Sequence, residues 1–192
     1  MKRKTIGIIA LVATAAGAAI FALTQLMPQD VPPTETVPAI TVTASPTAVE
    51  EFKPCYYVWA YQALPEITDE FQAAIADILP DAEATASAYG ENCVAEDGTF
   101  TFGAMETDFY VTLPVDDLND KAALGDIVEQ VLTLVIEQFP RPHVPGGQDG
   151  FVEFSFVAGT ETHILRAPIP LAKELLEKGL RGAELLQALE SQ

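Results

Sequence analysis

The amino-acid sequence predicts an α+β domain in which an antiparallel sheet carries helices on one face. Segments with helical apolar spacing alternate with extended segments in the order β-α-β-β-α-β-β-α. The first six elements match the ferredoxin-like β-α-β-β-α-β pattern, and a further hairpin strand and helices follow it. Asp97-Gly98 stands between two extended segments, which is typical of a hairpin turn. We therefore expect a ferredoxin-like core with a C-terminal extension.

The first strand and the first helix follow from local composition. Residues 55–62 (CYYVWAYQ) are aromatic and β-branched, which favours a strand. Pro65 then begins a helix that reaches Leu79, with Glu66 in the first turn, where the helix dipole favours an acidic side chain. Pro80 ends this helix, because proline cannot continue it.

Two more strands follow, and the second contains a break in its alternation. Residues 84–94 predict one strand and residues 99–113 predict the next. In the second strand, Phe102 and Phe109 fall in opposite phases, so a regular strand cannot bury both on one face. A β-bulge near Gly103 would bring the two phases into agreement.

The remaining elements begin with a long helix. A cap at Asp116 or Asp117 starts it, and it reaches Phe139. Apolar residues cover most of its circumference, so we expect a central buried helix. The chain continues as an irregular loop, a hairpin of two strands and two short helices, over residues 140–150, 151–157, 162–167, 170–178 and 182–190. Gly179 stands where a helix commonly ends in the left-handed conformation.

The N-terminal segment predicts the cellular location. Lys2-Arg3-Lys4 precede residues 6–27, which are apolar and carry no charge. About 20 apolar residues span a bilayer, and flanking basic residues stay on the cytoplasmic side. Residues 1–27 are therefore expected to be a single-pass membrane anchor that leaves the rest of the chain outside the cytoplasm. A cleaved signal peptide, which would release a secreted protein, is the alternative.

A linker separates this segment from the domain. Residues 28–54 hold six prolines, and five threonines lie between residues 34 and 47. Proline favours extended polyproline II structure, so this composition predicts a semi-stiff spacer. Residues 55–192 then form one acidic domain.

The charge of the chain excludes some partners. It contains 28 acidic and 10 basic residues, which gives a formal net charge of −18. Nucleic-acid binding needs clustered lysine and arginine, so no nucleic-acid partner is expected. The acidity is compatible with cationic ligands or a basic protein surface, and it is equally explained by solubility.

The two cysteines, Cys55 and Cys93, predict a disulfide in an oxidising compartment. This prediction conflicts with the ferredoxin-like order, which would place them at opposite ends of the sheet. A disulfide needs Cα atoms within about 7 Å. Of the two predictions, the disulfide carries more weight.

Three aromatic residues alternate along the first predicted strand. Tyr57, Trp59 and Tyr61 therefore share one face. If exposed, such a stripe would suit stacking on sugar rings or on a peptide. If covered by a helix, the same stripe would belong to the core.

Two further pairs could carry chemistry. Glu106 and Asp108 are two residues apart on a predicted strand, so their carboxyl groups share a face and could divide acid and base roles. A solvated strand face gives the same pattern. Arg141 and His143 lie in the irregular loop, where they could bind a ligand or interact with the end of the preceding helix.

No cofactor, metal or catalytic residue is predicted. The sequence contains no Gly-x-Ser-x-Gly elbow, no phosphate-binding loop and no His-Glu-x-x-His motif. The two cysteines show no local ligand spacing with either histidine, which argues against a zinc site.

Parts of the chain resemble a family of uncharacterised bacterial exported proteins with an anchor, a Pro/Thr linker and one domain. The resemblance covers residues 55–135. It rests on three stretches, Tyr57-Val58-Trp59-Ala60-Tyr61, Ala88-Tyr89-Gly90-Glu91-Asn92-Cys93 and Ala104-Met105-Glu106-Thr107-Asp108-Phe109-Tyr110-Val111-Thr112-Leu113. It implies the domain layout and membrane location, and no activity or site residue.

Together these features favour a membrane-tethered, extracytoplasmic module that binds a protein or another ligand without catalysis. A carbohydrate-binding module using the aromatic stripe is the alternative. A hydrolase based on Glu106 and Asp108 and a purely structural envelope component are further alternatives. The sequence leaves the ligand and the oligomeric state open.

Overall fold

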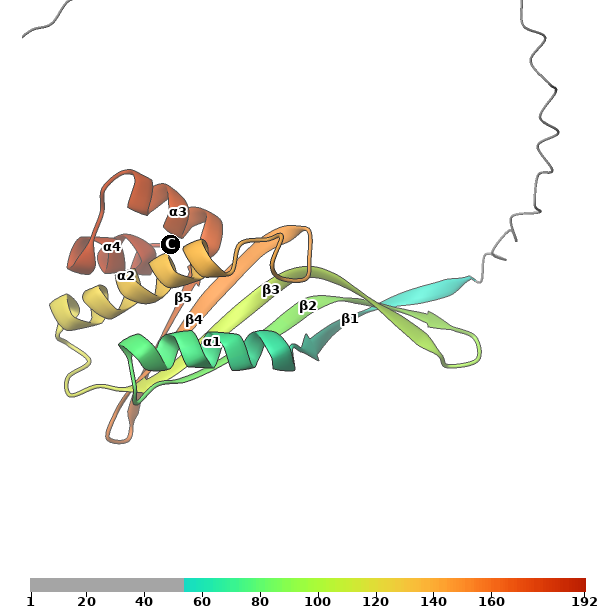
Figure 1. The fold of residues 1–192 in the computed structure, drawn as a ribbon, viewed down its shortest axis with the longest axis horizontal. Helices are drawn as coiled ribbons and strands as arrows, with labels where there is room; N and C mark the ends of the chain where they lie inside the picture. The colour runs from blue at the N-terminus through green and yellow to red at the C-terminus, as the bar shows by residue number, and fades with distance from the viewer. Residues whose placement is uncertain (1–53) are drawn as a thin grey trace, which may run out of the picture. The chain divides into compact units, whose positions relative to one another are not determined.

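The computed structural model describes residues 54–192, which form a mixed sheet of five strands and four helices (Figure 1). In chain order the elements are β1 (Cys55–Ala63), α1 (Pro65–Ile78), β2 (Glu83–Ala95), β3 (Phe100–Pro114), α2 (Lys121–Gln138), β4 (Gln148–Ala158), β5 (Glu161–Pro168), α3 (Ile169–Glu177) and α4 (Gly182–Glu190). Every predicted strand and helix is present, and most ends fall within one or two residues of expectation. The α+β class is confirmed.

The strand order differs from the expected one. The strands lie in the order β1-β2-β3-β4-β5, so the ferredoxin-like order is not confirmed. The prediction of a purely antiparallel sheet is also wrong, because β3 and β4 are parallel while the other pairs are antiparallel. The strands β3 and β4 are parallel because α2, which connects them, returns the chain to the end of the sheet where their pairing begins. A crossover connection of this kind is what two parallel neighbouring strands require.

The disulfide between Cys55 and Cys93 is present, as predicted, with the two Cα atoms 5.3 Å apart. It resolves the conflict posed by the sequence. Because β1 and β2 are antiparallel neighbours, the beginning of β1 lies beside the end of β2, where Tyr57 is opposite Cys93. The cysteines are therefore one diagonal step apart on adjacent strands.

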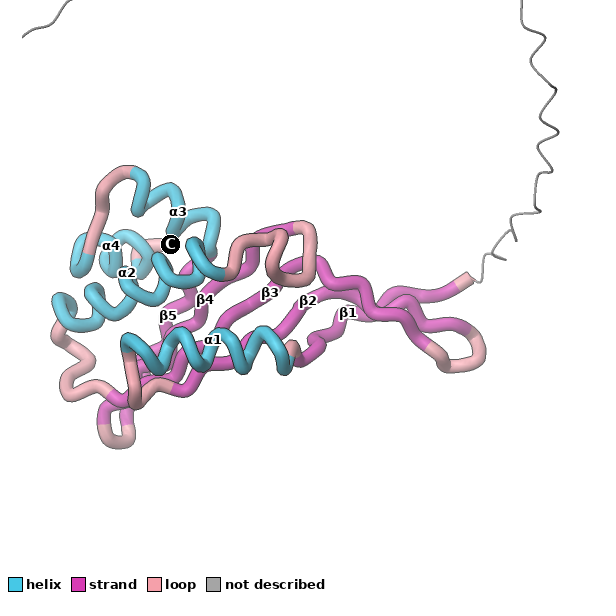
Figure 2. The backbone as a smooth tube through the Cα atoms, viewed as in Figure 1, coloured by secondary structure: helices cyan, strands magenta, loops and turns pink. Residues whose placement is uncertain are grey.

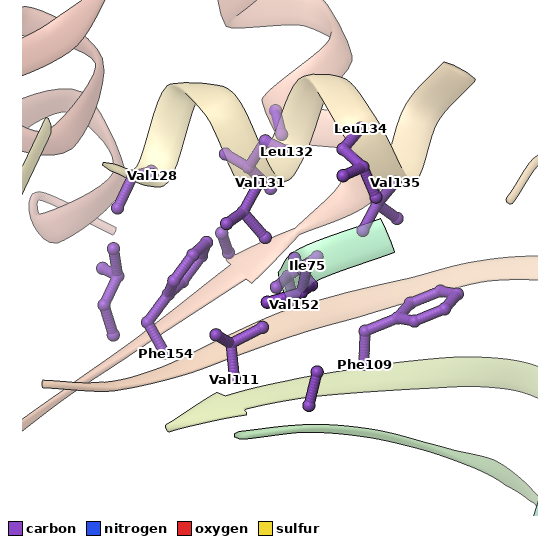
Figure 3. Close-up of a cluster of buried hydrophobic side chains, with 14 of the residues drawn as sticks. Ile75, Phe109, Val111, Val128, Val131, Leu132, Leu134, Val135, Val152 and Phe154 are labelled. Carbon is purple, nitrogen blue, oxygen red and sulfur yellow. The ribbon is translucent and has the colours of Figure 1, made fainter. Parts of the chain in front are cut away.

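The core lies between the sheet and the helices, which cover a single face. In Figure 3, Phe109 and Val111 of β3 and Val152 and Phe154 of β4 point toward α2. The helix contributes Val128, Val131, Leu132 and Val135, all 1% exposed or less, and Ile75 of α1 joins them. The central buried helix is thus confirmed as α2. Burial of these aliphatic and aromatic groups is the main favourable term in folding.

Helix α1 closes part of a sheet edge. The strand β1 ends at Ala63, opposite Ser87, so the first residues of β2, 83–86, have no neighbouring strand on that side. Side chains of α1 take its place: Thr68 Oγ1 accepts from Ala86 N–H at 2.9 Å. Gln72 Oε1 accepts from Ala84 N–H at 2.6 Å. These bonds satisfy edge groups that would otherwise be open to association.

The bulge predicted near Gly103 is present two residues further on. Gly90 pairs with Ala104 while Tyr89 pairs with Glu106, so Met105 is the extra residue. Its carbonyl oxygen accepts from Gly147 N–H at 2.9 Å. The loop before β4 thus satisfies a group that the bulge removes from the ladder.

The cap of α2 was predicted at the wrong residue. Asp120, rather than Asp116 or Asp117, accepts a hydrogen bond from Ala123 N–H at 3.1 Å. The helix begins later because residues 116–120 first form a turn, in which Asp117 accepts from Asn119 N–H at 2.8 Å. The glycine predictions hold: Gly98 and Gly179 have φ values of +81° and +87°.

The predicted anchor, residues 1–27, and the linker, residues 28–54 apart from its last residue, lie outside the described residues. Among residues 54–192, none of the helices has both the length and the apolar character needed to cross a membrane. The extracytoplasmic location therefore remains an expectation from the sequence.

Candidate binding surface

Three strands extend beyond the helices and form an arm, which we define as β1 with residues 89–95 of β2 and 100–106 of β3 (Figure 2). Every residue of β1 except Cys55 and Ala60 is exposed. The large apolar side chains here include Tyr56 and Phe100, which are 63% and 64% exposed. The arm therefore presents both faces of its sheet to solvent.

The aromatic stripe predicted from the sequence is one of these exposed faces. Tyr57, Trp59 and Tyr61 are 65%, 61% and 65% exposed, so the interpretation as core beneath a helix is wrong. Tyr89 of β2 joins them, with its ring centroid 5.5 Å from Trp59 and 5.0 Å from Tyr61. Aromatic contacts of this kind hold the rings in place. We call these four residues the aromatic row.

The strand register joins the aromatic row to the two predicted carboxyl groups. Tyr61 is opposite Tyr89, which is opposite Glu106, so all three side chains leave the same face of the sheet. Asp108 lies opposite Ser87 one step along that face. Because the helices cover the other face, we call this side the helix-free face. The structure thus brings the aromatic stripe and the Glu106–Asp108 pair together.

Asp108 is buried within this face, with no exposed surface. Its Oδ1 accepts from Phe151 N–H at 3.2 Å, and its Oδ2 has no hydrogen-bond partner among residues 54–192. Burial raises the pKa of Asp108 to about 6, and the charges of Glu106 and Glu153 act in the same direction. The Phe151 N–H and Arg166 oppose this rise of the pKa.

Further polar and aromatic groups surround Asp108. Arg166 donates to Glu153 at 2.6 Å, and its guanidinium lies 4.2 Å from the centre of the Phe151 ring. The Tyr110 ring meets Phe151 edge-on at 5.8 Å. Burial raises the pKa of Tyr110, while its hydrogen bond to Ser87 acts in the opposite direction. The helix-free face is therefore aromatic along the arm and mixed aromatic and charged around Asp108.

Arg141 and His143 do not belong to this surface. His143 Nε2 lies 2.8 Å from Glu70 Oε2 on α1, and Arg141 Nε lies 3.4 Å from Asp149 Oδ1. Lys173 of α3 also reaches Asp149, at 2.8 Å. These contacts attach the loop to the helix side of the sheet, which supports a structural role.

The acidic turn before α2, residues 116–120, is explained by local hydrogen bonds. Asp116, Asp117 and Asp120 line an open hollow of about 470 Å³ together with Asp81. Within residues 54–192, no three histidine, cysteine or acidic side chains are arranged to hold a metal ion. Asp117 and Asp120 instead bond to backbone N–H groups nearby.

Sequence reasoning missed four members of the helix-free face: Tyr89, Tyr110, Phe151 and Arg166. Each stands in the strand phase opposite to that of buried apolar neighbours, which is a signal for a solvent-facing position. The sequence does not say which strands are neighbours, so their grouping was not predictable.

Comparisons with known proteins identify no relative: no protein-family model, no curated protein and no solved structure matches the chain. The resemblance to exported bacterial proteins therefore remains an expectation from the sequence.

Proposed function

We propose that this chain is a membrane-tethered, extracytoplasmic binding module that holds an extended ligand along the aromatic row. One observation carries the proposal: Tyr57, Trp59 and Tyr61 are each more than 60% exposed on one face. Large aromatic groups are usually buried, and exposed clusters of them mark interaction surfaces. Tyr and Trp also provide large contact area at a small cost in side-chain entropy.

The surrounding charge narrows the chemistry of the ligand. The chain is strongly acidic, and Glu91 and Glu106 stand opposite Trp59 and Tyr89 in the ladder. A polyanionic ligand would be repelled by such a surface. An uncharged or basic extended ligand fits better, and a polypeptide satisfies this description.

A neutral glycan is the second candidate. It is supported by the uncharged character of β1, since residues 55–63 contain neither an acidic nor a basic side chain. A row of rings on alternate residues, with no charge between them, suits the apolar faces of sugar rings as well as it suits a peptide.

Chemistry at Asp108 remains a separate hypothesis. A carboxyl group with a raised pKa is typical of general acids, and this group lies on the same face as the aromatic row. A hydrolase role for Asp108 and Glu106 requires the strands around Asp108 to open, because its side chain has no exposed surface. It predicts turnover of a bound glycan or peptide, which Asp108→Asn would abolish while leaving binding by the aromatic row intact.

The test uses the fluorescence of Trp59, which is the only tryptophan in the chain. Full-length protein in mild detergent is titrated with soluble chitin and cellulose oligosaccharides and with extended peptides of basic, neutral and acidic composition. We expect saturable spectral changes with neutral or basic ligands and none with acidic ones. Retention on insoluble chitin or cellulose provides a second measurement that needs no fluorescence.

Variants distinguish binding by the aromatic row from non-specific binding elsewhere on the protein. Tyr57→Ala and Tyr61→Ala are each expected to weaken binding about tenfold or more, as loss of an interface anchor does. Ile164→Ala provides the matched control, because Ile164 is 61% exposed on the distant strand β5. Equal loss in all three variants, or no binding to any probe, would contradict the proposal.

A further inference from the structure

One edge of the sheet is open. The strand β1 ends the sheet order, and among residues 54–192 only β2 pairs with it. The opposite edge, β5, carries Glu161, His163 and Arg166 and ends at Pro168, all features that discourage a further strand. The edge of β2 beyond β1 is closed by Thr68 and Gln72 of α1. Within the part of the chain that the structure describes, the edge of β1 is the one without such protection.

The direction of the free backbone groups follows from one hydrogen bond. Ala63 lies opposite Ser87, so the next residue, Leu64, lies opposite Ala86. The Leu64 N–H donates to the Ala86 carbonyl oxygen at 3.2 Å. Hydrogen-bonded and non-hydrogen-bonded pairs alternate along an antiparallel ladder. The outward N–H and C=O groups of β1 therefore belong to Cys55, Tyr57, Trp59, Tyr61 and Ala63. The three members of the aromatic row that lie on β1, Tyr57, Trp59 and Tyr61, therefore also present their backbone to the open edge.

The sequence of β1 is nearly symmetric about Trp59. Tyr57 and Tyr61 stand two residues to either side, and Val58 and Ala60 stand one residue to either side. An antiparallel pair of identical strands centred on Trp59 would place each tyrosine opposite the other tyrosine of its partner. Cross-strand aromatic pairs of this kind stabilise a sheet. Such self-complementarity is what a two-fold interface requires.

The distribution of charge is compatible with a second copy of the same chain as the partner. Two copies of a chain with a formal charge of −18 repel one another over most of their surfaces. Residues 55–63 carry no charge, so edge-to-edge contact would bring no acidic side chains of β1 into opposition. Depletion of charge is also characteristic of the centre of a protein interface.

We propose that a second copy of this chain adds to the open edge, with β1 pairing antiparallel to the partner's β1 about a two-fold axis at Trp59. The product is a continuous ten-stranded sheet with all helices on one side. Both aromatic rows then lie next to each other on the common helix-free face. The association does not depend on the proposed ligand, so it is measured without one.

The first experiment determines the mass of the full-length protein in detergent by sedimentation velocity and native mass spectrometry. We expect a dimer, at twice the 20.6 kDa mass of the chain. Higher salt should favour the dimer, because screening weakens the repulsion between acidic copies. Trp59→Lys and Trp59→Glu should each be monomeric, because like charges directly opposite are destabilising. Trp59 is exposed, so both variants should retain their fold and disulfide.

Mixing the two variants tests the symmetry. Trp59→Lys and Trp59→Glu carrying different affinity tags should co-purify as a heterodimer, since opposite charges then meet at the two-fold axis. Ile164→Lys is the matched control and should remain dimeric. The register has its own test: Tyr57→Lys combined with Tyr61→Glu should dimerise, and Tyr57→Lys combined with Tyr61→Lys should not.

Amide hydrogen exchange distinguishes edge pairing from packing of faces. Dimerisation should slow exchange at the outward N–H groups of Tyr57, Trp59 and Tyr61. The N–H groups of Val58 and Ala60, which face β2, should be protected in monomer and dimer alike.

Two results would overturn the inference. One is a wild-type protein that stays monomeric at its highest soluble concentration in high salt. The other is a dimer that survives Trp59→Lys, which would place the contact elsewhere in the chain, for example at residues 6–27. A monomer that still binds glycans or peptides through the aromatic row would overturn the dimer and leave the proposed function standing.

Discussion

Asp108 accepts a hydrogen bond from the Phe151 N–H at 3.2 Å, across a position where β3 and β4 fall out of register. Thr107 pairs with Asp149 and Phe109 pairs with Val152, so Gly150 and Phe151 together lie opposite Asp108. The irregularity turns the Phe151 N–H toward the carboxyl group and allows the two strands to close over it. An ionisable side chain is thereby kept out of water within the helix-free face.

Replacing Asp108 by Asn should stabilise the protein at neutral pH. The folded-state pKa of about 6 exceeds the ordinary value of 3.8, so folding favours the protonated carboxyl. The contribution of Asp108 to the free energy of unfolding is then greatest below about pH 4, and it is lost as the pH rises through about 6. A difference of two pKa units corresponds to at most about 3 kcal/mol. Urea unfolding at pH 4 and pH 8 should show Asp108→Asn equal to wild type at the lower pH and more stable at the higher.

The matched variant for this experiment is Glu106→Gln, on the same face. It should change the pH dependence far less, because burial is the largest cause of the Asp108 shift and Glu106 is a lesser one. A wild-type protein whose stability relative to Asp108→Asn does not fall between pH 4 and pH 6 would show that the carboxyl is not buried in solution.

Gly150→Ala should be destabilising because there is no space for a methyl group. A Cβ at this position would lie 2.3 Å from both Asp108 Oδ1 and Thr107 O. Forced displacement of well-packed groups costs roughly 1–3 kcal/mol. Gly147→Ala is the control, because a Cβ there meets nothing within 4 Å. Chemical denaturation of both variants checks the prediction, and equal stabilities would argue against the close approach of β3 and β4.

Loss of the α1 side chains that close the β2 edge should cost stability and promote aggregation. Thr68→Val leaves the Ala86 N–H without its acceptor, and Gln72→Leu does the same to the Ala84 N–H. An unsatisfied buried group costs about 1–3 kcal/mol. Thr85→Val on the exposed side of β2 is the control and should be nearly neutral. Denaturation midpoints and light scattering measure the two effects, which should appear together.

Reduction of the disulfide should loosen the arm. Cys55 and Cys93 close a separation of 38 residues, for which the chain-entropy model gives a stabilisation of about 3–4 kcal/mol. Reductant should lower the urea midpoint of the wild-type protein and leave that of Cys55→Ser/Cys93→Ser unchanged. Hydrogen exchange should rise most along β1, because among residues 54–192 it has only one neighbouring strand, β2. An unchanged wild-type midpoint in reductant would mean that the bond adds nothing to stability.

Local patterns in the sequence were sufficient for the elements themselves. Alternating and helical apolar spacing located all nine elements, and Asp97-Gly98 located the β2–β3 turn. The two phases of β3 indicated a bulge near Gly103, which the structure places at Met105. The cap of α2 was missed because several acidic residues compete for that role within one turn, and local geometry alone selects Asp120.

Local sequence patterns predicted only part of the candidate binding surface. Alternation put Tyr57, Trp59 and Tyr61 on one strand face, and the same argument paired Glu106 with Asp108. It could not show whether a helix covered that face, since exposed and buried aromatic stripes have the same sequence period. Arg141 and His143 were selected because they lie in a long loop. The partner of His143, Glu70, is 73 residues away in sequence, so the contact that explains His143 could not be found from local patterns.

The sequence by itself determined the strands and helices, the disulfide and the acidity of this protein, because each depends on neighbours along the chain or on composition. Only the tertiary structure decided the strand order, the exposure of the aromatic row and the burial of Asp108. These depend on which segments pack together, which is governed by burial and backbone pairing across the whole domain. The open edge of β1 belongs to this second class, because a strand becomes an edge only through the placement of all the others.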